Sequence, residues 1–127
     1  MKRRWVTREL DVPAAVAWGL LTDIAAWPTW GPSVRSALLD EGRFEGGATG
    51  TVTTAVGVRL RFRITEVDPG RAWSWEVMGV PATGHRVEPL GPQRCRVGFS
   101  VPWPAVGYLP VCGIALRKLG RMAVRCR

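Results

Sequence analysis

The order of apolar and polar positions along the chain predicts mostly β-strands. Residues 58–67 give the clearest pattern, because Leu60, Phe62 and Ile64 alternate with arginines. Alternation of this kind is typical of a strand with one buried face. Similar stretches, separated by turns rich in Gly, Pro or Asp, predict six further strands. These strands cover residues 4–12, 34–39, 49–56, 71–78, 83–90 and 94–101.

Three other stretches show helical spacing. Residues 13–22 are rich in Ala and have Val and Leu at helical intervals. A short helical turn is predicted at residues 23–27 and should end at Pro28, because proline lacks the amide proton that a continuing helix needs. The C-terminal stretch from Leu109 has apolar residues on one side, and Pro110 means that this helix either begins near residue 109 or is kinked there.

This order of elements predicts an α+β fold in a single domain, residues 1–127. A chain of 127 residues has the usual size of one domain. Consecutive short strands joined by tight turns form antiparallel sheets, here of about seven strands. The helices lie at the two ends of the run of strands, as in α+β proteins. A sheet with one apolar face needs a cover, and the C-terminal helix is the long candidate.

The charge gives the chain a basic character without predicting a nucleic-acid partner. There are 18 basic and 10 acidic residues, for a net charge of +8. Such an excess can mark proteins that bind nucleic acids or anionic membranes. The cations here are mostly scattered arginines, so nucleic acid is disfavoured as a partner. A helical stripe of Arg117, Arg121 and Arg125 could make peripheral contact with a membrane, or it is an ordinary solvent-exposed helix face.

Several kinds of site and segment are not supported by the sequence. Three widely spaced cysteines and a single histidine indicate neither a metal site nor a disulfide framework. No glycine-rich loop precedes a helix, so we expect no nucleotide cofactor, and indeed no cofactor of any kind. Glu9 and Asp11 interrupt the apolar stretch that a signal peptide needs, and no apolar run is long enough to cross a bilayer. These features predict a cytoplasmic protein.

Four motifs, taken in order, resemble a known family. The letters VPAAVAWGLLTD at 12–23 and WPTW at 27–30 are similar to the opening signature of the START-like, or SRPBCC, superfamily. More narrowly, they resemble the bacterial polyketide cyclase/dehydrase and lipid-transport family. The letters ITEVDPGR at 64–71 and GHRVEP at 84–89 resemble later strands of that family. One departure is Ala17, which separates a valine from a tryptophan that the family places together.

The resemblance covers nearly the whole chain and implies a helix-grip fold. In that fold a curved antiparallel sheet wraps around the C-terminal helix, and two short helices follow the first strand. The cavity between sheet and helix would hold a hydrophobic small molecule such as a lipid, a polyketide or another polycyclic compound. Relatives include aromatase/cyclases, lipid carriers, coenzyme Q-binding proteins and plant hormone receptors, so the fold alone does not define the function.

Strand parity then predicts which side chains line such a cavity. They are the inward residues of the sheet and the apolar stripe of the C-terminal helix, with two tryptophans closing the mouth. Tryptophan suits a flat ligand because it offers a broad apolar surface and one N–H donor. The alternative is that the seven tryptophans fill the core. The predicted lining residues are Trp27, Trp30, Phe62, Ile64, Trp73, Trp75, His85, Val87, Phe99, Tyr108, Leu109, Cys112 and Leu116.

His85 is the candidate catalytic residue. The ordinary pKa of a histidine lies near neutral pH, so His85 could act as a general acid or base on a bound polyketide. Its neighbours depend on strand register. Pairing with Trp75 or Val77 would place it in an apolar pocket, whereas pairing with Glu76 would allow a histidine–carboxylate dyad. The alternative is a structural histidine held by a local hydrogen bond.

Three functional hypotheses follow. The preferred one is a protein that binds a hydrophobic small molecule in an internal cavity. The second is a polyketide cyclase, aromatase or dehydratase that uses His85 as its acid/base. The third is a basic module that interacts with RNA, the ribosome or a membrane surface.

Overall fold

The computed structural model describes residues 3–102 and 107–126. Within them the chain forms seven strands and three helices, in the order that the sequence predicts. The elements are β1 (Arg3–Leu10), α1 (Ala14–Thr22), α2 (Trp27–Trp30), β2 (Val34–Leu39), β3 (Thr49–Thr54), β4 (Arg59–Asp68), β5 (Ala72–Val77), β6 (Val80–Gly91), β7 (Arg94–Pro102) and α3 (Leu109–Cys126).

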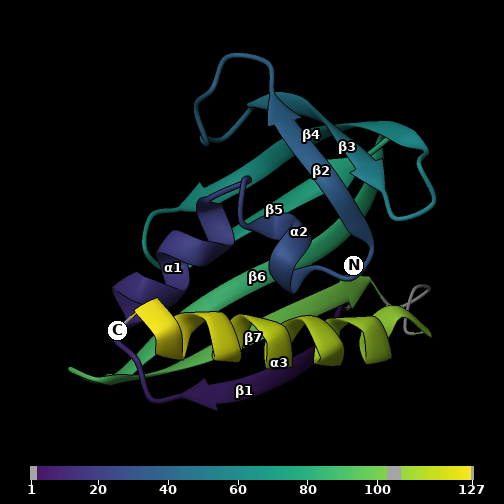
Figure 1. Cartoon of the computed structure of the whole chain (residues 1–127). Coiled ribbons are helices and arrows are strands. Elements are labelled where there is room, and N and C mark those ends of the chain that lie inside the picture. The colour runs from purple at the N-terminus through teal and green to yellow at the C-terminus, as the bar shows by residue number, and fades with distance from the viewer. Residues whose placement is uncertain (1–2, 103–106, 127) are drawn as a thin grey trace.

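All seven strands join one antiparallel sheet in the order β1-β7-β6-β5-β4-β3-β2. Strands β2 to β7 are therefore neighbours in the order of the sequence, and β1 closes the sheet beside β7. Figure 1 shows that the sheet curves and that α3 crosses its concave side, in front of β7 and β1. This helix packs against β1, β7, α1 and α2. The predicted α+β helix-grip fold is confirmed.

The strands follow the alternation of the sequence. In β4, Phe62 and Ile64 are buried against the core, and the three arginines of the strand face solvent. The helix α3 divides in the same way, with Cys112, Leu116 and Leu119 buried and its arginines exposed. Its first turn contains Pro110, so of the two alternatives the helix begins near residue 109.

The second helix differs from the prediction. A helical turn was expected at 23–27 and was expected to end at Pro28, but α2 covers Trp27–Trp30 and has Pro28 in its first turn. The amide protons of a first turn have no partner within the helix, so a proline costs nothing there. Gly31 ends the helix, and its amide donates to the Trp27 carbonyl.

The hairpin between β5 and β6 is tighter than the sequence suggested. A turn was expected at residues 79–82, but Val77 pairs with Val80 and the loop contains only Met78 and Gly79. Both have positive φ, 54° and 77°, as the two central residues of a type I′ hairpin turn require. An irregularity in β5 then brings His85 opposite Trp73. None of the helices in the described ranges is both long and apolar enough to cross a membrane.

Candidate functional site

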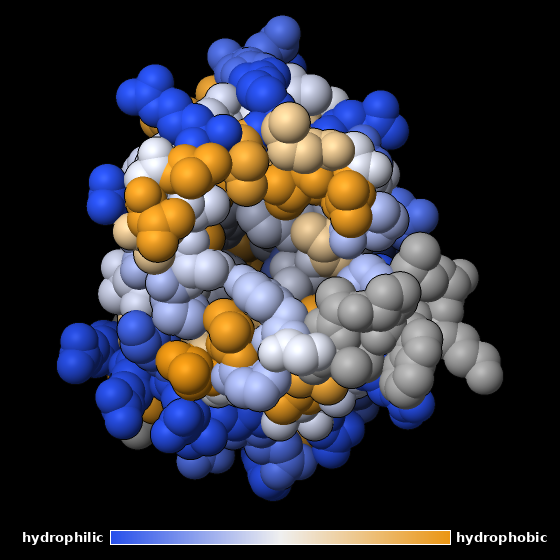
Figure 2. All heavy atoms as spheres, turned by 90° about the vertical axis from the view of Figure 1, so that its right-hand side faces the viewer, coloured by the Kyte–Doolittle hydropathy of each residue, from blue (hydrophilic) through white to orange (hydrophobic). Residues whose placement is uncertain are grey.

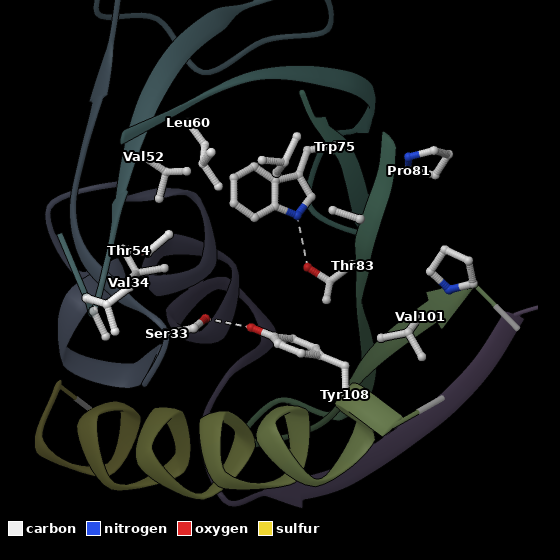
Figure 3. A pocket seen from close by; sticks show the side chains of 15 residues that line it. Ser33, Val34, Val52, Thr54, Leu60, Trp75, Pro81, Thr83, Val101 and Tyr108 are labelled. Carbon is white, nitrogen blue, oxygen red and sulfur yellow. Dashed lines mark hydrogen bonds between the residues drawn. The ribbon is translucent and has the colours of Figure 1, made fainter. Parts of the chain in front are cut away.

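A cavity of about 510 Å³ lies between the concave face of the sheet and the beginning of α3 (Figure 3). This is within the usual range for small-molecule sites. All of its lining side chains are uncharged, and most are apolar. The lining consists of Ser33, Val34, Val52, Thr54, Ala55, Val56, Leu60, Trp75, Val77, Pro81, Ala82, Thr83, Val101, Pro102 and Tyr108.

The cavity opens to the surface beside the hairpins β3–β4 and β5–β6. Figure 2 shows the opening as a hollow with apolar side chains along its upper rim. At the opposite side, the Tyr108 hydroxyl lies 2.5 Å from the Ser33 hydroxyl. This hydrogen bond links the beginning of α3 to the loop between α2 and β2 (Figure 3). The two hairpins and this link therefore frame the cavity.

A second, deeper space of about 50 Å³ continues toward the core. Five residues line both spaces, namely Ser33, Val34, Trp75, Thr83 and Tyr108. The deep space is much smaller than the sites that hold organic ligands. Its walls are largely aromatic, and they belong to a packed cluster rather than to an open pocket.

That aromatic cluster contains several of the predicted lining residues. Trp27 stacks on Trp73 with ring centroids 5.4 Å apart, and His85 stacks on Trp73 at 3.8 Å. The N–H of Trp27 donates to the Leu21 carbonyl at 2.9 Å. Trp30, also buried, packs against Phe99. The expectation that Trp27 and Trp30 close the mouth is therefore wrong, since their rings are needed to fill the core between α2 and the sheet.

The structure divides the predicted lining residues into three groups. Trp75 and Tyr108 line the large cavity. Six line the deep space and not the large cavity, namely Trp27, Trp30, Trp73, His85, Phe99 and Cys112. Five line neither space, namely Phe62, Ile64, Val87, Leu109 and Leu116. Ligand contact by any of them stays a prediction.

Sequence reasoning missed most of the large cavity's apolar wall. Leu60 shares its strand face with Phe62, and Val77 shares its face with Trp75, so parity identified the face on which both lie. The alternation does not reveal at which position along each strand the packed core ends and the cavity begins. Residues nearer the hairpins line the cavity, and residues farther from them fill the core.

His85 belongs to a directed chain of hydrogen bonds. Its Nδ1 lies 3.3 Å from the Trp73 carbonyl, which can only accept, so Nδ1 holds the proton. Its Nε2 then accepts from the Thr83 hydroxyl at 3.0 Å. The Thr83 oxygen in turn accepts from the Trp75 indole N–H at 2.9 Å. The histidine is thus held as one neutral tautomer, and its strand partner is Trp73 rather than Trp75, Val77 or Glu76.

The titratable groups facing the two spaces are uncharged near neutral pH. Burial lowers the pKa of His85 to about 3, with a further lowering by the positive charge of Arg3, although the hydrogen bond to Trp73 opposes it. Burial raises the pKa of the Cys112 thiol to about 11. Burial likewise raises the pKa of Tyr108. None of these groups offers a charge to a ligand or a proton of near-neutral pKa to a reaction.

The buried neutral histidine predicts an acid-sensitive fold. Below its ordinary pKa of 6.5, His85 takes up a proton in the unfolded chain but not in the folded one. The contribution of His85 to the free energy of unfolding is therefore fully present above that pH, and it is lost progressively as the pH falls toward the folded-state pKa. We expect the free energy of unfolding to drop by roughly 2 kcal/mol between pH 7 and pH 5.

Urea denaturation at several pH values measures this slope. His85 is the single histidine of the chain, and carboxylates titrate mainly below this window. A His85→Gln variant should therefore have nearly constant stability between pH 7 and pH 5. An unchanged slope in that variant would show that another group causes it.

The described residues provide no metal site. No three His, Cys, Asp or Glu side chains in ranges 3–102 and 107–126 gather closely enough to hold an ion. Within the same ranges the free thiols with a described environment, Cys95 and Cys112, are both buried.

Comparison with solved structures shows the same fold in several proteins. A START superfamily protein from Mycobacterium smegmatis has a TM-score of 0.78 at 14% identity, covering 98% of this chain and 99% of that one. The Zhui aromatase/cyclase from Streptomyces sp. R1128 has a TM-score of 0.75 at 14% identity, with 98% and 94% covered. Norcoclaurine synthase from Thalictrum flavum, solved with dopamine and hydroxybenzaldehyde, has a TM-score of 0.66 at 12% identity, with 99% and 88% covered. At these identities the likeness concerns the fold alone.

Sequence comparison defines the family more narrowly. A search of curated proteins found no match. A family model described as polyketide cyclase / dehydrase and lipid transport matches residues 4–120, which include β2 to β7, all of β1 but its first residue, and most of α3. With its START-like helix-grip fold, the chain therefore belongs to the polyketide cyclase / dehydrase and lipid transport family.

Proposed function

We propose that this protein binds an uncharged, hydrophobic small molecule in the cavity of about 510 Å³. The observation that supports this most is the absence of any charged side chain among the lining residues of the described chain. Burying a charged ligand group there would cost free energy that no partner could offset. A lipid, a polyketide or another polycyclic compound fits this chemistry.

Thr83 defines the polar preference that we propose for this ligand. Its hydroxyl proton is donated to His85, and one of its two lone pairs accepts from Trp75. These two bonds leave one lone pair of the oxygen over, and Thr83 lines both spaces. Thr83 can therefore accept a hydrogen bond but has no proton to give, which favours a ligand with a hydroxyl group at its inner end.

The second candidate function, a polyketide cyclase, aromatase or dehydratase using His85, ranks below binding. A useful acid/base has a pKa near the working pH, and the lowered pKa of His85 makes it a poor acid and a weak base. His85 does not line the large cavity: it lines the deep space and an open groove beside Arg3 and Ser100. We also propose a reducing, cytoplasmic setting, supported by the free buried thiols of Cys95 and Cys112.

Filling the cavity tests the binding function. Leu60 and Val77 are half-buried in the cavity wall, so Leu60→Trp combined with Val77→Trp should occupy much of the space with uncharged aromatic side chains. Binding of the neutral apolar dye N-phenyl-1-naphthylamine, followed by fluorescence titration, should weaken at least about tenfold as its binding volume is lost. Leu38→Trp is the matched control, since Leu38 is exposed on β2 and lines no part of the cavity.

Native mass spectrometry of the purified wild-type protein supplies the second measurement. We expect a co-purified neutral molecule that disappears in the filled variant and persists in the Leu38→Trp control. A wild-type protein that carries no such molecule and does not bind the dye would contradict the proposed function.

A further inference from the structure

Four apolar side chains at the tips of two hairpins are exposed to solvent around the cavity mouth. Val56 is 84% exposed and Val58 is 51% exposed on the β3–β4 hairpin. Met78 is 62% exposed and Val80 is 64% exposed on the β5–β6 hairpin. We call these four residues the apolar rim. Figure 2 shows apolar side chains gathered on one side of the hollow.

The fold does not require apolar side chains at these positions. Met78 has a φ of 54°, a left-handed conformation that suits Gly or Asn better than a residue with a long side chain. The other tip is closed by its own backbone, because the Thr54 amide donates to Val58 and the Gly57 amide donates to Thr54. Both tips are thus well-formed turns that hold apolar groups outward, where they contribute nothing to the core.

The apolar rim is continuous with the cavity. Val56 belongs both to the rim and to the cavity lining, and Val77 and Pro81 of the lining adjoin Met78 and Val80 in the sequence. A molecule leaving the cavity across the rim would therefore meet apolar side chains before it met water.

Two arginines flank the rim at the β3–β4 tip. The hairpin segments 50–64 and 77–87 contain no Asp or Glu, although Arg61 and Arg63 form ion pairs with Asp40 and Glu76 outside them. Arg59 is exposed directly after Val58, and Arg35 donates to the Ala55 carbonyl at the same tip. Exposed apolar tips with flanking arginines are the combination that binds the interface of an anionic bilayer, where the apolar groups enter the lipid and the cations meet the headgroups.

We propose that the apolar rim docks on an anionic membrane surface and places the cavity mouth against the bilayer. Exchange of a ligand with the membrane rests on the proposed function, whereas docking itself does not. A second copy of the chain is a poorer occupant, because stable dimers use about 20–30 residues on each side and two hairpin tips offer fewer. The stripe of Arg117, Arg121 and Arg125 on α3 is exposed elsewhere, on the helix rather than on these tips.

Vesicle co-sedimentation of the full chain tests the proposal. The vesicles are phosphatidylcholine alone, and phosphatidylcholine mixed with phosphatidylglycerol. We expect binding to the anionic vesicles, and binding at least about tenfold weaker in a Val58→Asp/Met78→Asp variant, because two inserted apolar groups are lost. Neither of these two rim residues lines the cavity. Aspartate tolerates the conformation of Met78, so the variant should fold. An unchanged thermal midpoint checks this.

Two controls separate the apolar rim from charge in general. Arg117→Gln/Arg121→Gln lowers the net charge by the same two units on α3, and Leu38→Asp removes an exposed apolar residue from β2. Both controls should bind the anionic vesicles within about threefold of the wild type, because neither site would contact the membrane.

Several outcomes would overturn the proposal. They are a wild type that binds no vesicle, a rim variant that binds like the wild type, and a loss of binding in the α3 control instead. A wild-type dimer that the rim variant abolishes in sedimentation equilibrium would identify a second copy as the occupant. Dye binding in the same samples keeps the two proposals apart, since the rim variant should still bind N-phenyl-1-naphthylamine. Vesicle binding without dye binding would contradict the cavity function alone.

Discussion

A Trp27→Ala variant is expected to lose about 3–5 kcal/mol of its free energy of unfolding, the usual cost of removing a large aromatic side chain from a core. Trp27 is buried, stacks on Trp73 and meets the edge of Trp75 at 5.3 Å. Its indole N–H also satisfies the Leu21 carbonyl at the end of α1. Truncation would remove all of these contacts and leave a void that the rigid sheet cannot close.

Urea denaturation with Trp5→Ala as the matched control measures this loss. Trp5 is 41% exposed, on β1, where the Arg86 guanidinium lies 4.3 Å from its ring centre. Its removal should cost only about 1 kcal/mol, the scale of a single exposed cation–π contact with some packing. If Trp27→Ala kept its stability and lost dye binding instead, Trp27 would be a ligand-contact residue rather than part of the core.

Gly50→Ala is expected to be the most damaging single-methyl substitution, at roughly 3 kcal/mol, the upper end of the range for overpacking. A Cβ added at Gly50 would overlap with the Leu38 carbonyl oxygen and lie 2.5 Å from Cζ of Phe62. The neighbouring strand's backbone cannot move aside without breaking the β2–β3 pairing. Glycine is needed here because the Phe62 ring of β4 lies across β3.

The control for this substitution is Gly46→Ala. A Cβ at Gly46 would meet nothing within 4 Å, and its backbone does not have positive φ. Thermal unfolding should show a large drop in midpoint for Gly50→Ala and almost none for Gly46→Ala. Similar small shifts in both variants would mean that β2 and β3 separate more easily than their register implies.

The sequence predicted the architecture well because its main determinant is local. The alternation of Phe62 and Ile64 with arginines, and the apolar stripe from Cys112 to Leu119, each depend on a few neighbouring residues. Pro28 shows the limit of a local rule, since proline ends a helix in its interior but is accepted in its first turn.

The site was harder to predict because its determinants are long-range. Trp27 fills the space between α2 and β5, and nothing in its own segment reveals that Trp73 lies 5.4 Å away. The partner of His85 depends on a two-residue turn and on an irregularity between Ser74 and Glu76. One more residue in the turn or at the irregularity would move every side chain of the strand to the opposite face of the sheet. The sequence therefore allows several partners for His85 and does not choose among them.

The pairing of β1 with β7 has a consequence for the order of folding. Arg3 pairs with Pro102, so the first strand to be synthesised needs the last strand as its partner. Strands β2 to β7 can assemble hairpin by hairpin, each with the strand before it. During synthesis β1 therefore remains without its strand partner until β7 and α3 have been made. We expect this long-range pairing of β1 with β7 to limit the folding rate.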